Sequence, residues 1–190
     1  MTRWKLFGVL TICLSCLAVA AFALAPDWVR SLQYVVRATA RTSFVLFLAV
    51  FMAAPLVKLA PSVPTRALAR ERRYIGLSFA VSQFLHALAL VAYVGTAPEA
   101  FWAGRTTVTN IPGFIGYLMI LLLTATSFAT PARLIGPENW KQLHLLGVWI
   151  LAIIFAGSFF TRVHLHASYL APGMAMVAAM LLRVAARFGT

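Results

Sequence analysis

The sequence predicts an all-α membrane protein, a bundle of six transmembrane helices. Of its 190 residues 62% are hydrophobic and only 11% are charged, and the mean hydropathy is +0.90. A water-soluble domain has a far more polar composition. Long apolar runs follow one another with short gaps, and each approaches the ~20 residues that a helix needs to cross a bilayer. We expect residues 1–190 to form a single transmembrane domain, so that any catalytic domain belongs to another chain.

The first span is expected at about residues 6–25. Its basic start, apolar centre and small residues at the end are typical of a retained first span and also of a cleaved signal peptide. The length of the run favours a retained span. Cys13 and Cys16 lie within it. A C-x-x-C spacing can indicate metal or redox chemistry, but there is no second cysteine pair, and we interpret both as small apolar residues of the helix.

The remaining spans are separated by segments rich in proline, glycine and basic residues. Residues 26–41 contain Trp28, Tyr34 and three arginines, which favours a loop or a short amphipathic helix at the membrane surface. Further spans are predicted at about residues 42–59, 74–94, 114–130, 143–160 and 168–186.

The basic residues indicate the orientation. With six spans and the N-terminus inside, eleven of the sixteen Lys and Arg residues fall on the cytoplasmic side: Arg3, Lys5, Lys58, Arg66, Arg70, Arg72, Arg73, Arg133, Lys141, Arg183 and Arg187. The other five are Arg30, Arg37, Arg41, Arg105 and Arg162. This bias predicts that both termini are cytoplasmic. The formal charge of +12 is therefore explained by topology and anionic lipids rather than by nucleic acid.

Two of the four histidines are expected within the spans, and no acidic residue is. His86 lies near the middle of the third span and His144 at the start of the fifth, whereas His164 and His166 follow the fifth span in an outer loop. An ionisable side chain inside a membrane is costly and marks a candidate functional site. The four acidic residues, Asp27, Glu71, Glu99 and Glu138, are all expected in loops, which argues against a carboxylate proton relay. Imidazoles on the helices of an apolar bundle instead favour a heme site.

Two motifs carry a family resemblance. The run from Arg72 and Arg73 through Gly76 to His86, and the run Asn139-Trp-Lys-Gln-Leu-His144, are similar to the ferric-reductase-like transmembrane superfamily. Within it, the chain most resembles the heme-binding membrane subunit of the periplasmic methionine sulfoxide reductase system (MsrQ/YedZ-like). The resemblance covers roughly residues 37–144 and, more weakly, a core to residue 188.

This resemblance implies a multi-pass protein of the bacterial inner membrane that binds one or two b-type hemes, with FMN or a quinone as further cofactors. Such a protein passes electrons from a cytoplasmic flavin reductase or quinol to a periplasmic molybdopterin oxidoreductase. It is a redox subunit rather than a complete enzyme. The alternatives are a heme-free assembly or interaction subunit and a ferric or cupric metal reductase.

The resemblance carries His86 and His144 over as heme ligands, but the chain departs from the family at one position. The family usually has a further histidine thirteen residues after the one that matches His144, and here that residue is Gly157. His86 lies thirteen residues beyond Arg73, or ~20 Å into the membrane, whereas His144 lies only ~5 Å beyond Lys141. The two do not pair easily across one heme. His86 therefore needs another partner, which His164 or His166 could supply if the fifth span is longer or the loop folds inward. The alternative is a five-coordinate or weakly ligated heme, with His144 as an inner ligand or as a polar residue without that role.

Other residues near these motifs have two interpretations each. Arg73, with Arg72, is expected either to pair with heme propionates or to serve only as a topological charge. Trp140 and Gln142 are expected either to position the inner end of the fifth span or to anchor it at the interface.

Overall fold

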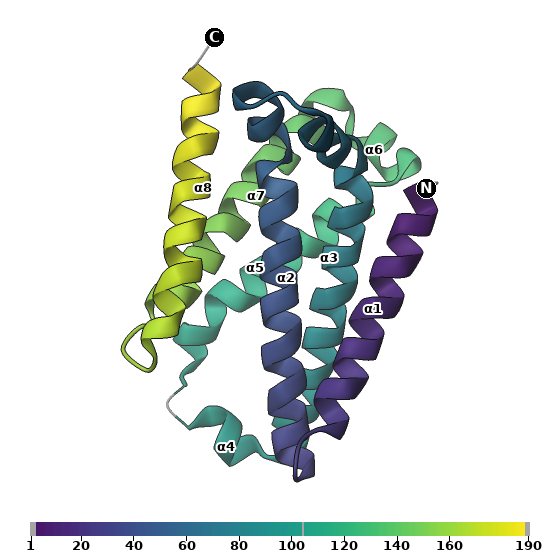
Figure 1. The fold of residues 1–190 in the computed structure, drawn as a ribbon. Helices are drawn as coiled ribbons and strands as arrows, with labels where there is room; N and C mark the ends of the chain where they lie inside the picture. Colours follow the sequence, from purple (N-terminus) through teal and green to yellow (C-terminus); the bar gives the residue numbers. More distant parts are fainter. Residues whose placement is uncertain (1–2, 104, 189–190) are drawn as a thin grey trace. The chain divides into compact units, whose positions relative to one another are not determined.

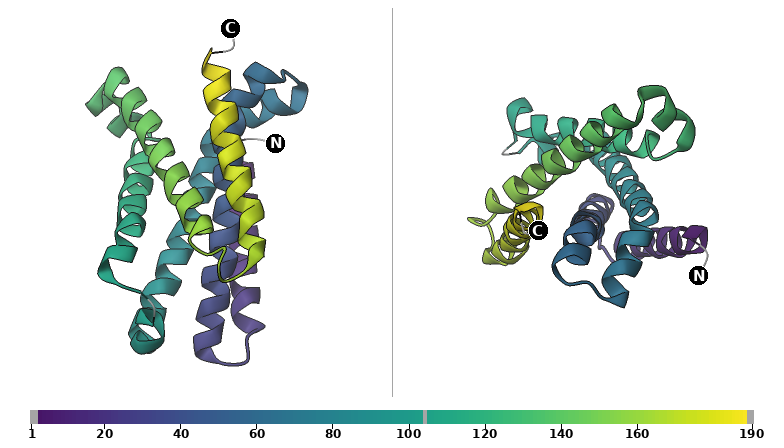
Figure 2. Two further views of the ribbon diagram at one scale, coloured as in Figure 1. Left: turned by 90° about the vertical axis from the view of Figure 1, so that its left-hand side faces the viewer. Right: turned by 90° about the horizontal axis from the view of Figure 1, so that it is seen from above.

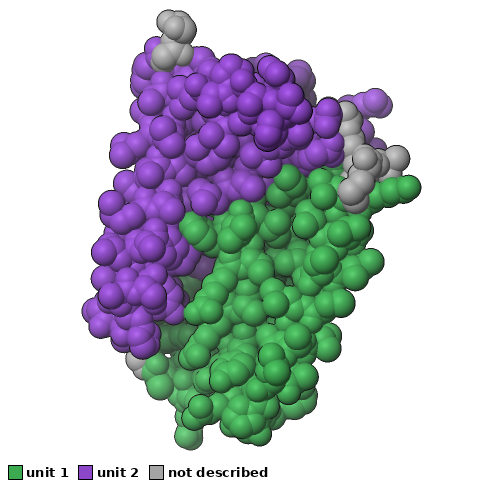
Figure 3. Space-filling view, viewed as in Figure 1, with its two compact units in different colours: residues 1–47, 73–111 green, residues 48–72, 112–190 purple. Residues whose placement is uncertain are grey.

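The structure, a computed structural model, describes residues 3–103 and 105–188, and these residues fold as helices. Six of the described helices are long and apolar enough to cross a membrane, as predicted. The chain divides into two compact units (Figure 3). Unit 1 comprises residues 1–47 and 73–111, and unit 2 comprises residues 48–72 and 112–190. The helices, drawn in Figure 1, are α1 Arg3–Ala23, α2 Trp28–Leu59, α3 Val63–Thr96, α4 Pro98–Trp102, α5 Thr107–Ala125, α6 Ala129–Ile135, α7 Pro137–Phe160, the 3-10 turn Ala167–Tyr169 and α8 Leu170–Phe188.

Unit 1 is built from α1, the first part of α2 and most of α3, which lie side by side (Figure 1). At one end of the unit, Leu32, Tyr93 and Phe101 form a buried apolar cluster. The Gln33 side-chain amide donates to the Tyr93 hydroxyl at 2.7 Å next to this cluster. At the other end, the rings of Trp4 and Tyr74 meet edge to face with centroids 5.2 Å apart. The N-terminal part of α1 therefore lies against α3 at Tyr74.

Most helices begin before the predicted spans. The largest difference is in α2, which starts at Trp28 rather than near residue 42, so the expectation of a separate surface segment at residues 26–41 is wrong. α3 likewise starts at Val63 and contains Glu71, which was expected in a loop and pairs with Arg70 at 3.1 Å. A hydropathy pattern marks where a helix is apolar, whereas a helix ends only where its backbone bonding ends.

Unit 2 is built around α5, α7 and α8. Figure 2 shows the turn that joins α7 to α8, which pack against each other. α5 approaches α7 closely at Gly147, where an added Cβ would lie 3.0 Å from the Leu123 side chain. Gly136, with φ at 79°, allows the sharp turn between α6 and α7 because only glycine adopts this conformation easily.

An arginine compensates for a proline within unit 2. Pro55 lies inside α2 and has no N–H, so the carbonyl of Phe51, four residues earlier, loses its helical hydrogen bond. The guanidinium of Arg183 in α8 donates to this carbonyl. It also lies 4.5 Å from the centre of the Phe51 ring, which in turn meets Trp149 of α7 edge to face. One guanidinium thus joins α2 to α8 at the position where α2 is weakest.

We predict that Arg183→Met lowers the free energy of unfolding by about 1–3 kcal/mol, because it leaves a buried carbonyl without a donor. The loss should be smaller in a Pro55→Ala background, since the new N–H of residue 55 can bond to Phe51. Thermal unfolding of the four proteins of this double-mutant cycle in detergent measures the coupling. Arg187→Met, one turn along α8, is the control and should be nearly neutral. If Arg183→Met lowered the free energy of unfolding equally with and without Pro55, Arg183 would not be compensating for the proline.

Candidate functional site

His86 is held by its Nδ1 atom. It lies on α3, half-buried in unit 1, and Nδ1 is 3.0 Å from the carbonyl oxygen of Val36 and 3.0 Å from the hydroxyl oxygen of Thr39. A carbonyl can only accept, so Nδ1 carries the proton. The Thr39 hydroxyl donates its own hydrogen to the Val35 carbonyl at 2.7 Å and therefore also accepts from Nδ1. In the neutral ring the Nε2 atom then carries the lone pair that a metal ion requires.

A second set of hydroxyls orients the same part of α3. Ser82 is fully buried one helical turn before His86, and its hydroxyl donates to the Thr39 carbonyl at 3.2 Å. Ser43 donates to the Ser82 oxygen at 2.8 Å, and the Thr42 hydroxyl is 3.1 Å from it. Thr39 thus binds Ser82 through its backbone and His86 through its side chain. We call these residues, Thr39, Thr42, Ser43, Ser82 and His86, the α2–α3 polar ladder.

His144 is held by the opposite nitrogen. It lies on α7, and its Nε2 atom is 3.1 Å from the hydroxyl of Thr126, which follows α5. That hydroxyl donates to the Leu122 carbonyl at 2.6 Å, so it accepts from His144 and Nε2 carries the proton. His86 therefore has the tautomer in which Nε2 can bind a metal, whereas in His144 the same atom is a hydrogen-bond donor.

Trp140 positions His144. Its indole Nε1 donates to the Thr126 carbonyl at 2.8 Å, and its ring lies against the imidazole with centroids 4.3 Å apart. This favours the first of the two roles considered for Trp140. Gln142 is exposed, and its amide contacts Glu138 at 3.4 Å on the same helix.

The other predicted ligands occupy exposed positions. α7 ends at Phe160, and His164 and His166 follow it in a turn with their side chains exposed. Gly157 is exposed on α7, and a Cβ added there would meet no atom within 4 Å. Arg72 and Arg73 are exposed on α3, and the Arg73 guanidinium lies 5.8 Å from the centre of the Tyr74 ring. Cys13 and Cys16 are exposed free thiols on α1.

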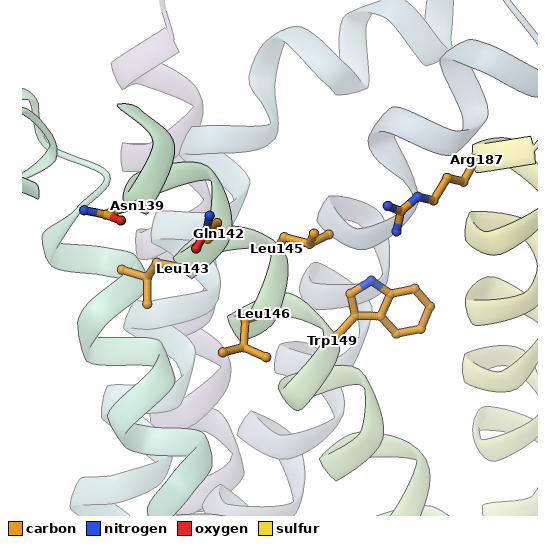
Figure 4. A pocket seen from close by; sticks show the side chains of 7 residues that line it. All are labelled: Asn139, Gln142, Leu143, Leu145, Leu146, Trp149 and Arg187. Carbon is orange, nitrogen blue, oxygen red and sulfur yellow. The ribbon is translucent and has the colours of Figure 1, made fainter. Parts of the chain in front are cut away.

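Unit 2 contains a cavity of about 660 Å³ along α7 and α8. Figure 4 shows its lining: the polar side chains of Asn139, Gln142 and Arg187 and the apolar side chains of Leu143, Leu145, Leu146 and Trp149. Sequence reasoning did not find this cavity, because its residues come from two distant segments. It is an open groove rather than an enclosed pocket, with polar side chains among mostly apolar ones.

The donor set fits a heme better than a bare metal ion. In residues 3–103 and 105–188, no group of three or more His, Cys, Asp or Glu side chains is placed to hold a metal ion. A heme brings four nitrogen ligands of its own and needs only axial ligands from the protein. His86 fits the role of an axial ligand. Its Nδ1 atom donates to the Val36 carbonyl, and metal-bound histidines usually donate through the ring nitrogen that does not bind the metal. His144 does not fit the role of an axial ligand through Nε2, because that atom donates to the Thr126 hydroxyl.

Comparison with known proteins identifies the family. The sequence profile of the ferric reductase like transmembrane component matches residues 39–155, and the chain belongs to this family. The matched segment contains His86 and His144 but not α1, His164, His166 or α8. No match was found among curated proteins or among solved structures.

We predict opposite tautomers for the two histidines. In heme-free protein, ¹⁵N NMR of labelled histidine should show protonated Nδ1 for His86 and protonated Nε2 for His144. Thr126→Val should convert His144 to a mixture of tautomers, since it removes the acceptor of Nε2. Thr39→Val should leave the His86 tautomer in place, because the Val36 carbonyl remains. Protonated Nε2 at His86 would contradict the proposed hydrogen bonding.

Proposed function

We propose that this member of the ferric-reductase-like transmembrane family is a heme b electron-transfer subunit of the bacterial inner membrane. Membership of the family supports a role in membrane electron transfer. The observation that carries the heme assignment is the anchoring of His86 through Nδ1 at 3.0 Å from the Val36 carbonyl. A bound heme supplies one-electron chemistry, and the protein supplies its ligand, its depth and a low dielectric.

The residues of the chain would have separate roles in this function. His86 would hold the iron, and the α2–α3 polar ladder would keep its ring in place. Apolar side chains of the bundle would exclude water. We infer that electrons enter from a cytoplasmic flavin reductase or a quinol and leave to a periplasmic oxidoreductase of the methionine sulfoxide reductase type. The cavity along α7 and α8 supports the quinol alternative, since Trp149 offers a ring surface and Arg187 a hydrogen-bond donor.

A heme-free assembly subunit is the second candidate. Two observations favour it: Gly157 replaces the histidine usual in the family, and the Nε2 atom of His144 is used by Thr126. Absorption spectra of purified protein separate the two candidates. Soret and α bands that appear on reduction would support the heme subunit. Protein that stays folded and colourless after heme supplementation would support the assembly subunit.

We predict that His86→Ala abolishes the heme absorption bands, because it removes the iron ligand. His144→Ala, the matched control on α7, should retain most of the bound heme, since His144 acts as a donor to Thr126. Heme content per protein, measured by the pyridine hemochrome assay, gives the comparison. Loss of heme in His144→Ala with retention in His86→Ala would reverse the assignment.

A further inference from the structure

The Nδ1 proton of His86 is shared between two oxygen atoms of α2. The carbonyl oxygen of Val36 and the hydroxyl oxygen of Thr39 each lie 3.0 Å from Nδ1. Val36 and Thr39 are three residues apart on one helix, and so they are neighbours on its surface. The carbonyl alone is enough to fix the tautomer, because it can only accept a hydrogen bond. The second acceptor, Thr39, is therefore not needed to keep the proton on Nδ1.

The Thr39 side chain is held so that its oxygen faces Nδ1 as an acceptor. Its single hydrogen has two carbonyl oxygens of its own helix within reach, that of Val35 at 2.7 Å and that of Val36 at 3.2 Å. The backbone carbonyl of Thr39 accepts from the buried Ser82 hydroxyl of α3 at 3.2 Å, which fixes this turn of α2 against α3. Thr39 is only 3% exposed, so water has little access to its hydroxyl. The hydroxyl oxygen is thus a fixed acceptor for the imidazole.

An acceptor at Nδ1 changes the electron density at Nε2, the other nitrogen of the ring. Polarising the Nδ1–H bond gives the imidazole some anionic character, which makes Nε2 of His86 a stronger donor to a metal ion. Ferric iron carries one positive charge more than ferrous iron and gains more from a stronger donor. Hydrogen bonds that involve charge are also stronger than neutral ones, and more so in a low dielectric. Each acceptor at Nδ1 therefore favours the ferric over the ferrous state.

We propose that the Thr39 hydroxyl lowers the reduction potential of a heme whose iron is bound by His86. This inference rests on the proposed heme function and extends it. The Val36 carbonyl sets the tautomer of the ring, and the Thr39 hydroxyl sets how strongly the ring donates to the iron. Thr39 acts through His86 and does not touch the iron itself. A lower potential makes the reduced heme a stronger electron donor to the next redox centre.

Thr39 and Thr42 provide a matched pair of variants. Like Thr39, Thr42 returns its hydroxyl to carbonyls of its own helix, those of Ala38 at 3.1 Å and Thr39 at 3.2 Å. Its contact with α3 is the Ser82 hydroxyl at 3.1 Å rather than His86. Thr→Val removes one hydroxyl at either position with little change in shape. Neither substitution leaves a helix carbonyl without a donor, since the backbone N–H four residues later remains.

Redox titration of the heme-loaded full chain in detergent, followed by the α band, measures the effect. At a fixed ambient potential, Thr39→Val should raise the ratio of reduced to oxidised heme by roughly tenfold, which is ~59 mV for one electron. Thr42→Val should titrate like the wild type. Thr39→Ser, which keeps a hydroxyl, should also have the wild-type potential.

The heme-free chain gives a second, independent measurement. The ¹H resonance of the His86 Nδ1 proton should move upfield in Thr39→Val, because one of the two acceptors that deshield the proton is lost. It should stay in place in Thr42→Val. An unchanged resonance in Thr39→Val would overturn the proposal, since the hydroxyl would then not accept from the ring.

The redox titration also separates this proposal from the heme function. Equal potentials in Thr39→Val and the wild type, or the same rise in Thr39→Val and Thr42→Val, would overturn the role of Thr39 and leave the heme function intact. A chain that binds no heme would overturn the heme function, and the role of Thr39 with it. If Thr39→Val does not fold, Thr39→Ala removes the same hydroxyl and decides by the same criteria.

Discussion

The arrangement of unit 1 depends on the hydrogen bonding of hydroxyl groups buried between α2 and α3. A polar side chain in an apolar bundle must find a partner inside the protein, since lipid offers none. Ser82 finds the Thr39 carbonyl, and His86 finds the Thr39 hydroxyl and the Val36 carbonyl. Sliding α2 by one turn would break all three bonds together. The α2–α3 polar ladder therefore sets the register of the helices and the orientation of the imidazole at the same time.

In unit 2 a buried polar group also needs a hydrogen-bond partner inside the protein, and a side chain from another helix supplies it. There the unsatisfied group is a backbone carbonyl, that of Phe51, which Pro55 leaves without its helical donor. Arg183 supplies the missing donor from α8, and its charge is spread over the Phe51 ring. A positive-inside count treats Arg183 as a topological charge. Its hydrogen bond shows that it also joins two helices, so composition alone understates its role.

The sequence was sufficient to predict the fold class, the six spanning helices and the family, because each follows from apolar length or from local motifs. It could not predict that α2 begins at Trp28, since the arginines of residues 30–41 lower the hydropathy of a segment that is nonetheless helical. The sequence placed His86 and His144 at different depths, but it could not tell which ring nitrogen of each is protonated. The difference lies in which ring nitrogen meets an acceptor, and this depends on Val36 and Thr126, which are distant in sequence.

The register of α2 also bears on the orientation of the chain. Five arginines were assigned to the outer side, and three of them, Arg30, Arg37 and Arg41, lie in one segment that was expected to be a loop. Because Thr39 is level with His86, Arg37 and Arg41 belong to the membrane band rather than to an outer loop. Only Arg30, Arg105 and Arg162 then remain outside, against the eleven basic residues assigned to the inner side. The positive-inside rule counts charges in loops near the ends of spans, so this revised count raises the charge bias on which the predicted orientation rests. That both termini are cytoplasmic stays a prediction.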